Sequence, residues 1–512
     1  MIFSIIYCVI LNILNRAQIH KSLIYHFDYC NLMKICFVMP PMASGYWKKL
    51  GKKVGPQSEP LSLCYIASYL NSKGYKADII DCIAEDLTEE EIEQRLREGK
   101  YDIVGVTMLT LMYTQALNVC KIVKKINPKT YVVIGGPHPT IAASATLQNE
   151  KDIDFAVIGE AEITFYELLK ALDGEIKLSA VDGLAYKTND GKVMLNNQRK
   201  LIDDLDILPM PDRSLLKMEL YRPSVSYYKR LPAYIILTTR GCPYRCTFCS
   251  KVFDKKYRQN SVEYTIKEMK YLMEEFGAKE IVFRDDTFTM KFPWVTEFCN
   301  KLIEEGLNKK IRWSCMTRVN LVNLEMLKLM KKAGCWGIHF GVESGNQRLL
   351  NLIKKDVTVQ QIKDAFKWCK EAGVETRAFM MLGLPTETKE ESLETIRFAK
   401  ELDPDWAQFT ITTPYPGTEL YKQANEHGEL KSIDWNNYQT WAGFSENDLV
   451  WTTNGRESSE LKALQRKALR EFYFRPKFIL KKLVHIDNLP IFRKYVLGAW
   501  ALLTTGEGRA ME

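Results

Sequence analysis

The chain has 512 residues, of which 46% are hydrophobic and 26% are charged. This length and balance exclude a mainly disordered protein and favour two or three soluble domains. Lys and Arg exceed Asp and Glu by 71 − 63 = 8, a modest surplus that does not indicate a nucleic-acid partner. The 13 cysteines form only one tight cluster, which favours buried free thiols in a reducing cytosol over a secreted disulfide framework.

The first predicted strand lies in the segment MKICFVMPP, which begins at Met33. Upstream of it, residues 1–32 show neither helical nor alternating periodicity. Their apolar start is too short to span a bilayer and has no basic residue before it, so it is not typical of a signal peptide. We interpret residues 1–32 as an upstream-start artefact or a mobile arm.

Short apolar runs alternate with amphipathic stretches from residue 34 to about residue 172. The strand candidates are KICFVM, KADIID, IVGVT, YVVIGG and FAVIG. Helical stretches such as LSLCYIASYLNSKGY and TQALNVCKIVKKI separate them. This order predicts a doubly wound, flavodoxin-like α/β domain over residues 33–175, with its ligand loops at the carboxyl ends of the strands.

Residues 176–230 differ in character, and we interpret them as a connector between domains. They contain a hairpin-like segment, GLAYKTNDGKVML, and the proline-punctuated LDILPMPDR. A second alternation begins at Tyr234, with the strand candidates YIILTT, EIVFRD, RWSCM, GIHFGV, ETRAFMML and WAQFTITT. Six strand–helix units predict a partial (β/α)6 barrel over residues 231–435.

Residues 436–512 are predicted to form a mainly helical carboxyl-terminal extension. The stretch from Glu460 mixes basic and aromatic residues, and Pro476 is expected to break its helix. The favoured interpretation is a helix that caps the barrel. The alternative is a membrane-surface element, because basic amphipathic stretches bind interfaces. We therefore expect a cytoplasmic protein, with membrane association as the alternative.

One short loop carries most of the chemical signal. The stretch RGCPYRCTFCS places Cys242, Cys246 and Cys249 directly after the first predicted barrel strand, on the face where such folds carry active sites. Three thiolates can hold three irons of a 4Fe-4S cluster and leave the fourth open to a chelating ligand, for which S-adenosylmethionine is suited. A structural zinc site is the alternative, but no second CxxC or paired histidine follows at zinc spacing.

This CxxxCxxC loop, with an aromatic residue before its last cysteine, resembles the signature of the radical S-adenosylmethionine (radical SAM) superfamily. The resemblance extends to FRDDTFT, GVESG, MLGLPTET and TPYPGTELY after later barrel strands. It implies that the three cysteines bind the cluster. The implied S-adenosylmethionine contacts are Phe248 at the adenine, Asp285 or Asp286 at the amino group, Glu343 and Ser344 at the ribose, and Gly383 in the fifth loop. Turn, cap or core roles are the alternatives.

The amino-terminal domain, with PLSLCYIASYL, GGPHPT and DFAVIGEAE, resembles the cobalamin-binding domain that precedes the barrel in one branch of this superfamily. The DxHxxG loop that usually supplies a cobalt ligand is absent from the sequence, so we expect the histidine of GGPHPT to line the site without binding cobalt. The predicted corrin-side residues are Thr107, Gly135, Gly136, His138, Glu160 and Glu162. Ordinary turn and cap roles are the alternative.

The resemblance implies an enzyme that cleaves S-adenosylmethionine to a 5′-deoxyadenosyl radical and requires an external electron donor such as flavodoxin or ferredoxin. With cobalamin present, it favours methylation of an unactivated carbon in a small or lipid-like substrate. A cobalamin-dependent radical cyclase or oxidoreductase is the alternative. A nucleic-acid-modifying enzyme of the methylthiolation type is disfavoured, because no extra cluster domain with three further cysteines is visible in the sequence.

Overall fold

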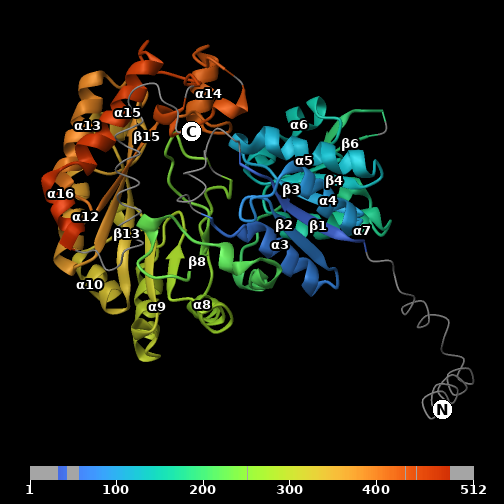
Figure 1. Cartoon of the computed structure of the whole chain (residues 1–512), viewed down its shortest axis with the longest axis horizontal. Helices are drawn as coiled ribbons and strands as arrows, with labels where there is room; N and C mark the ends of the chain where they lie inside the picture. Colours follow the sequence, from blue (N-terminus) through green and yellow to red (C-terminus); the bar gives the residue numbers. More distant parts are fainter. Residues whose placement is uncertain are drawn as a thin grey trace, which may run out of the picture.

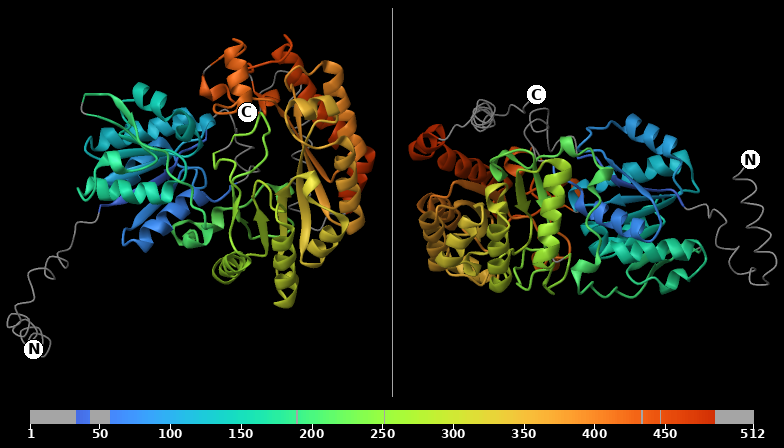
Figure 2. Two further views of the ribbon diagram at one scale, coloured as in Figure 1. Left: turned by 180° about the vertical axis from the view of Figure 1, so that it is seen from behind. Right: turned by 90° about the horizontal axis from the view of Figure 1, so that it is seen from below.

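The computed structural model describes residues 33–42, 57–188, 190–250, 252–432, 434–445 and 447–484. These residues form two α/β lobes that lie side by side in all views (Figures 1 and 2). Residues 1–32, interpreted above as an artefact or an arm, and the tail beyond residue 484 lie outside the described residues. Within the described part, no helix has the length and apolar character needed to cross a membrane.

The amino-terminal lobe is built on a seven-stranded sheet with the order β2-β1-β3-β4-β5-β6-β7. Its first five strands are parallel, and they are β1 (Ile35–Met39), β2 (Ala77–Asp81), β3 (Ile103–Thr107), β4 (Tyr131–Gly135) and β5 (Phe155–Val157). The helices are α3 (Leu61–Ser72), α4 (Glu89–Gly99), α5 (Tyr113–Ile126), α6 (Pro137–Asn149) and α7 (Ala161–Leu172). Because α4, α5 and α6 pack on one face and α3 and α7 on the other, the predicted doubly wound fold is confirmed.

The hairpin predicted inside the connector belongs to this sheet. β6 (Leu184–Lys187) pairs antiparallel with β5, and β7 (Val193–Leu195) pairs antiparallel with β6. The hairpin covers the edge of the short β5, which would otherwise present unpaired backbone groups. The sheet of the first lobe therefore extends past the predicted domain boundary at residue 175.

The second lobe is a curved six-stranded sheet with the order β15-β14-β13-β12-β11-β8, in which all neighbouring strands are parallel. The strands are β8 (Ala233–Ile236), β11 (Glu280–Phe283), β12 (Arg312–Thr317), β13 (Cys335–Glu343), β14 (Glu375–Leu382) and β15 (Trp406–Ile411). The helices are α8 (Val262–Phe276), α9 (Phe292–Glu304), α10 (Leu324–Lys332), α11 (Gln347–Leu352), α12 (Val359–Ala372) and α13 (Lys389–Leu402). The predicted partial barrel is confirmed, and Figure 2 shows its helices on the outer side of the curve.

The largest hydrophobic core lies between this sheet and its outer helices. Alternate side chains of each strand point outward into it, as the period of a strand requires, and examples are Phe283, Phe340 and Phe409. The remaining alternate side chains face the concave side of the half-barrel. The convex core fixes the curvature of the sheet and leaves the concave side for ligands.

The carboxyl-terminal region packs onto the barrel. It contains α15 (Ser458–Tyr473) and α16 (Pro476–Val484), and α14 (Glu419–Glu426) precedes it. Leu464, Leu469 and Phe472 of α15 join the barrel core, and α15 lies against β15. The predicted capping helix is therefore confirmed, and the predicted helix break falls at Pro476, where proline lacks a backbone donor.

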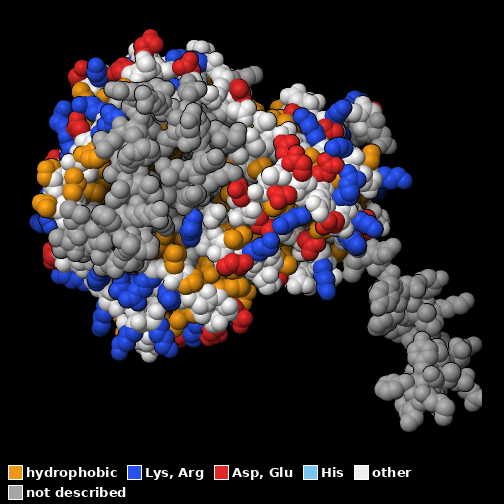
Figure 3. Space-filling view, viewed as in Figure 1, with side chains coloured by type: hydrophobic (Ala, Val, Ile, Leu, Met, Phe, Trp, Pro, Cys, Tyr) orange, Lys and Arg blue, Asp and Glu red, His pale blue; other side chains and the backbone are white. Residues whose placement is uncertain are grey.

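On one face of the amino-terminal lobe (Figure 3), charged side chains of both signs are interspersed. On the face drawn in Figure 3, Lys and Arg lie beside Asp and Glu across the described part of this lobe, without a stripe of one sign. This face therefore carries no large field of one sign.

Candidate active site

The cysteine loop starts at the carboxyl end of the first barrel strand. β9 (Thr239–Arg240) pairs antiparallel with β10 (Arg258–Gln259), so the loop over residues 241–257 returns to its starting point. Gly241 opens it with a φ of 86°, and a Cβ there would lie 2.2 Å from the carbonyl oxygen of Lys256. Glycine is required at this position because any side chain would strike the returning backbone.

The three predicted cluster ligands lie in this loop as free thiols. Cys246 is buried, Cys242 is half-buried and Cys249 is exposed. They are electrostatic neighbours, since desolvation, followed by Asp286 and the other two thiols, raises the pKa of Cys249 to about 12. Among the described residues, no three His, Cys, Asp or Glu side chains already stand at metal-binding separation. Three free thiols on one loop suit the three protein ligands of a 4Fe-4S cluster, which binds them as thiolates.

An arginine that follows β12 holds the cysteine loop. The guanidinium carbon of Arg318, just after β12, lies 3.5 Å from the centroid of the Tyr244 ring. Its Nη1 lies 3.6 Å from Sγ of Cys246. A guanidinium that stacks on Tyr244 and contacts the Cys246 sulfur helps to orient the loop. No sequence motif pointed to Arg318, because the contact joins residues that are 72 positions apart.

Backbone hydrogen bonds attach the loop to two helices near the predicted adenine contact. The amide of Thr247 donates to the carbonyl oxygen of Ile353 after α11, over 3.0 Å, and the amide of Leu420 in α14 donates to the carbonyl oxygen of Thr247, over 2.9 Å. Phe248 is half-buried beside an apolar cluster that includes Met381 of β14. The adenine contact of Phe248 stays a prediction, since the ring also contributes to this cluster.

The structure separates the two adjacent aspartates after β11. Asp285 is fully buried, and its carboxylate accepts hydrogen bonds from the amides and hydroxyls of Thr238 and Thr239, over 2.6 to 3.0 Å. Asp286 is exposed, and nearby protein atoms desolvate its carboxylate and raise its pKa. Asp285 therefore fixes the start of the cysteine loop, whereas Asp286 has a carboxylate available for a ligand.

The predicted ribose contact Glu343 forms a buried ion pair at the end of β13. Its Oε1 accepts a hydrogen bond from Nζ of Lys355 over 2.7 Å, and its backbone has a φ of 67°, a left-handed conformation uncommon outside glycine. A Cβ at Gly341 would lie 2.5 Å from Glu343 Oε1 and 2.7 Å from Lys355 Nζ. The GVESG motif thus needs its first glycine to make room for the ion pair.

Ser344 and Gly383 are both in contact with neighbouring helices of the protein. Ser344 is fully buried, and its hydroxyl lies 3.0 Å from the hydroxyl of Thr395 in α13. Gly383 has a φ of 75°, and a Cβ there would lie 3.2 Å from the Leu461 side chain of α15. These contacts disfavour a ribose contact by Ser344, because its side chain points into the layer between strand and helix.

The predicted corrin-side residues Thr107, Gly135 and Gly136 lie together at the carboxyl edge of the first sheet. Gly136 has a φ of 100°, and a Cβ there would lie 3.1 Å from Oγ1 of Thr107, so the turn requires glycine. In front of Gly135, a Cβ would meet no heavy atom nearer than 4.0 Å. The two glycines let a ligand approach the backbone closely at this edge, which is where doubly wound sheets bind ligands.

His138 lies beside this edge and is 1% exposed. Its Nδ1 lies 3.2 Å from Oγ1 of Thr110, and its Nε2 has no partner among the described protein atoms. Its ring packs between Tyr113 and Trp435, with centroids 4.9 and 5.4 Å away. Burial lowers the pKa of His138 to about 4, so the ring is neutral at pH 7. A buried nitrogen without a partner suits the lining of a ligand site.

Glu160 and Glu162 join the two lobes and do not face open space. Arg240, two residues before Cys242, donates to Glu160 over 2.9 Å and to Glu162 over 2.6 Å, and Arg258 donates to both carboxylate oxygens of Glu160 over 2.8 Å. All four side chains are buried. These ion pairs disfavour the predicted corrin contacts of the two glutamates. The only sequence signal for this bridge is the arginine at the start of RGCPYRC.

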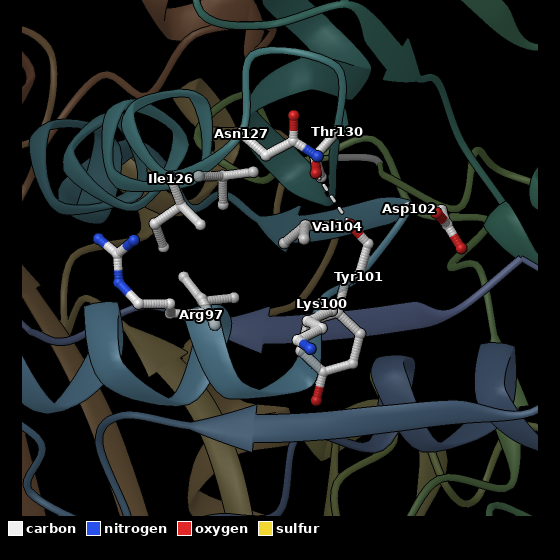
Figure 4. A pocket seen from close by; sticks show the side chains of 10 residues that line it. Arg97, Lys100, Tyr101, Asp102, Val104, Ile126, Asn127 and Thr130 are labelled. Carbon is white, nitrogen blue, oxygen red and sulfur yellow. Dashed lines mark hydrogen bonds between the residues drawn. The ribbon is translucent and has the colours of Figure 1, made fainter.

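A cavity of about 150 Å³ lies in the amino-terminal lobe, away from these residues. Figure 4 shows Tyr101 and Asp102, which precede β3, and Asn127 and Thr130, which precede β4, around it. It therefore lies at the amino-terminal edge of the sheet, opposite the edge that carries Gly135 and His138. Ligands of doubly wound sheets bind at the carboxyl edge, so we assign this cavity no part in the site.

Comparisons with known proteins match both lobes. The family model described as B12 binding domain matches residues 47–169, and the Radical SAM superfamily model matches residues 236–399. Uncharacterized methyltransferase PH0819 from Pyrococcus horikoshii is 40% identical over 452 residues, which cover 88% of this chain and 94% of that protein. Anaerobic magnesium-protoporphyrin IX monomethyl ester cyclase from Rubrivivax gelatinosus is 31% identical, over 80% of this chain and 73% of its own.

Solved structures share the two-lobed fold. The cobalamin-dependent S-adenosylmethionine radical enzyme OxsB, with aqua-cobalamin and S-adenosylmethionine bound, has a TM-score of 0.71 at 17% identity and covers 93% of this chain and 72% of its own. The relatives and the family models together confirm the resemblance seen in the cysteine loop and the glycine turn. The chain belongs to the radical SAM superfamily, in the branch whose barrel follows a B12-binding domain, and its cofactors are a 4Fe-4S cluster, S-adenosylmethionine and cobalamin.

Proposed function

We propose that this radical SAM enzyme transfers a methyl group to an unactivated carbon of a small or lipid-like substrate. The observation that carries the proposal is the bridge between the lobes, in which Arg240 joins the base of the cysteine loop to Glu160 and Glu162 at the start of α7. The carboxyl edges of the two sheets are thereby held near each other. Such an arrangement lets a methyl carrier and a radical source serve one substrate.

The relatives favour methyl transfer and also support one alternative. The relative at 40% identity is named an uncharacterized methyltransferase, and the match covers 94% of its length. The relative at 31% identity is named a cyclase, so a cobalamin-dependent cyclase or oxidoreductase is the second candidate. Both candidates use the same cofactors, and only the product distinguishes them.

The described residues suggest how each cofactor is held. We assign the cluster to Cys242, Cys246 and Cys249, and the methionyl amino group to Asp286, because the carboxylate of Asp285 is already saturated. When bound, the reduced cluster and S-adenosylmethionine supply a hydrogen-abstracting radical, and cobalamin supplies a transferable methyl group. The corrin is assigned to the edge formed by Thr107, Gly135, Gly136 and His138.

Other residues of the chain position these groups. Arg318 orients Cys246 through its Tyr244 stack, and Lys355 neutralises Glu343 beside the cluster loop. Reduction of the cluster requires an external one-electron donor, for which flavodoxin or ferredoxin is suited. The predicted membrane contact of the carboxyl-terminal region stays a prediction, with Ile479 and Leu480 of α16 exposed.

The test is an isotope experiment with the anaerobically reconstituted enzyme, cobalamin, a reductant and methyl-labelled S-adenosylmethionine. The small-molecule fraction of cells that lack the gene supplies the accumulated substrate. We expect label in one new product, with 5′-deoxyadenosine and S-adenosylhomocysteine formed in proportion to it. Formation of 5′-deoxyadenosine with an unlabelled, cyclised or oxidised product would contradict methyl transfer and support the second candidate.

The control is Cys246→Ala, which removes one cluster ligand and leaves the first lobe unchanged. We expect this variant to retain corrin absorbance, to lose the absorbance of the cluster and to form neither by-product. If it made 5′-deoxyadenosine at the wild-type rate, the assignment of Cys246 as a ligand would be wrong.

A further inference from the structure

The concave side of the half-barrel is less completely buried than its convex side. On the convex side, Ile338 and Phe340 of β13 are at most 1% exposed. On the concave side, Met316 of β12, Phe379 of β14 and Gln408 of β15 are all half-buried. The two sets alternate along the strands because successive side chains point to opposite faces. The concave side is called the lumen below.

A tyrosine from the connector forms the floor of the lumen. The amide of Lys229 donates to Glu280 at the start of β11, and its ammonium group forms an ion pair with Glu375 at the start of β14. The connector thus crosses the amino-terminal ends of the barrel strands. Tyr227, two residues earlier, stacks on His339 of β13 with ring centroids 4.7 Å apart and an interplanar angle of 13°.

Two guanidinium groups meet on this tyrosine ring. The guanidinium carbons of Arg377 and Arg284 lie 3.9 and 4.2 Å from the centroid of Tyr227. Arg377 is 6% exposed, and its Nε and Nη2 have no hydrogen-bond partner among the described residues. Arg284 donates to the weakly accepting sulfur of Met316 over 3.7 Å. Neither arginine forms an ion pair with a carboxylate in the part of the chain that the structure describes.

His339 adds a third unpartnered group. It pairs in register with Arg377 across β13 and β14, is 3% exposed, and has no partner at either ring nitrogen within the described chain. Burial, followed by the charges of Arg377 and Arg284, holds the pKa of His339 well below its ordinary value. The ring is therefore neutral and has one N–H to donate.

The carboxylates at the starts of β11, β14 and β15 are engaged elsewhere. Glu280 accepts from two backbone amides and from Trp336, Glu375 pairs with Lys229, and Asp405 pairs with Lys481 and accepts from the amide of Thr376. Among the described residues, the two cations thus have no carboxylate counter-ion in the lumen. Desolvated cations are unfavourable unless an anion or hydrogen bonds compensate them.

We propose that Arg284, His339 and Arg377 bind an oxyanion group of the substrate, a carboxylate or a phosphate, inside the half-barrel. The planar guanidinium fork matches both groups and binds them through paired hydrogen bonds. The inference rests on the proposed function, because it takes the lumen to hold the substrate on which the radical acts. The competing explanation is a purely structural cluster, in which stacking on Tyr227 alone compensates the charges.

The test uses the anaerobically purified, full-length holoenzyme with saturating S-adenosylmethionine, so that the carboxylate of this cofactor is already bound. Trifluoroacetate is the carboxylate probe, followed by fluorine NMR, and inorganic phosphate is the phosphate probe, followed by phosphorus NMR. At constant ionic strength, we expect the wild type to broaden the resonance of at least one probe saturably. The probe that binds more tightly identifies the group as carboxylate or phosphate.

Variants assign the binding to the three residues. In the double variant Arg284→Gln and Arg377→Gln, we expect the dissociation constant of the probe to rise about tenfold or more. Arg377→Lys keeps the charge and should retain part of the affinity. Arg397→Gln is the matched control, because Arg397 is exposed on α13, and it should leave binding unchanged. Iron and corrin contents equal to the wild type verify that each variant is folded, and if the double variant is not, Arg377→Gln alone supplies the comparison.

The proposal is overturned if the wild type binds neither probe with S-adenosylmethionine present, or if folded arginine-to-glutamine variants bind as tightly as the wild type. These outcomes are independent of the methyl-transfer experiment, since anion binding requires no turnover. Anion binding with a cyclised product would refute methyl transfer alone. A methylated product without anion binding would refute the lumen site alone.

Discussion

At the scale of single residues, adjacent carboxylates in the barrel have different environments. Asp285 is surrounded by four hydrogen-bond donors from Thr238 and Thr239, whereas its neighbour Asp286 is exposed beside the cysteine loop. Glu280 is also fully buried and supports the floor of the barrel. The chemical role of each carboxylate follows from these partners and not from its residue type.

The two aspartates are expected to respond differently to mutation. Asp285→Ala leaves two backbone amides unsatisfied and should lower the free energy of unfolding by about 2–5 kcal/mol. Asp285→Asn should be tolerated, because its Oδ1 keeps three of the four hydrogen bonds and its amide can donate to the Thr238 hydroxyl. Asp286→Asn should keep stability but weaken S-adenosylmethionine binding. Thermal unfolding and equilibrium binding check this, and equal S-adenosylmethionine affinity in Asp286→Asn and the wild type would refute the assignment.

Glu280 should make the free energy of unfolding depend on pH in a defined way. Burial raises its pKa from 4.5 to about 7, so the folded protein holds this proton more tightly than the unfolded chain does. Its stabilising contribution is thus present below about pH 4.5 and is lost as the pH rises through about 7. In Glu280→Gln, the fall in unfolding free energy between pH 5 and 8 should shrink by up to about 3 kcal/mol. Urea denaturation followed by tryptophan fluorescence measures the unfolding free energy at each pH. The control Glu390→Gln, at an exposed position, should show the same change between pH 5 and 8 as the wild type.

At the scale of elements, the cysteine loop is anchored at several separate points. The β9–β10 ladder closes its base, Thr247 ties its centre to α11 and α14, and Arg318 stacks on Tyr244. These anchors come from strand ends and helix ends that are distant in sequence. These anchors let a loop without regular secondary structure hold its three cysteines in a fixed spatial arrangement.

Arg318→Leu should release the cysteine loop without disturbing the first lobe. The variant loses the stack on Tyr244 and the contact with Cys246, together worth about 1–3 kcal/mol. We expect a lower iron content and a lower cluster absorbance, with an unchanged corrin content. Arg245→Lys, at an exposed position of the same loop, is the control and should retain iron. An unchanged iron content in Arg318→Leu would show that the backbone anchors are sufficient.

At the scale of the whole molecule, a buried ion network joins the two lobes. Glu160 accepts from Arg240 and Arg258, and Arg240 also pairs with Glu162. The network lies at the root of the cysteine loop, so we expect it to couple the position of the three cysteines to the first lobe. Buried ion pairs are worth little in net stability, but the loss of one partner leaves an uncompensated charge.

Glu160→Gln should therefore lower the free energy of unfolding and should let the two lobes unfold separately. We expect a loss of about 3–5 kcal/mol, because two arginines lose their shared carboxylate. Calorimetry should then resolve two unfolding transitions where the wild type shows more cooperative unfolding. Corrin and iron should still bind, while turnover falls. Glu167→Gln, at a half-buried pair with Arg199 inside the first lobe, is the control, and a single transition in Glu160→Gln would contradict the coupling.

The sequence alone was sufficient for most of the fold, and it also singled out the three candidate cluster ligands. Strand and helix periods are local properties, so the two strand–helix alternations predicted both lobes and the capping helix. The spacing of Cys242, Cys246 and Cys249 is fixed by the covalent chain, and the glycine turn at Gly135 and Gly136 is equally local. These features survive in the structure because they depend on few long-range contacts.

Only the tertiary structure decided which polar side chains remain free for ligands. It assigned Asp285 to the threonines, and it assigned Glu160 and Glu162 to arginines about 80 to 98 residues away. It also brought Arg284, His339 and Arg377 onto Tyr227, a residue that the sequence placed in a connector. Such encounters depend on strand register and on the packing of one lobe against the other, and neither is encoded in a local pattern.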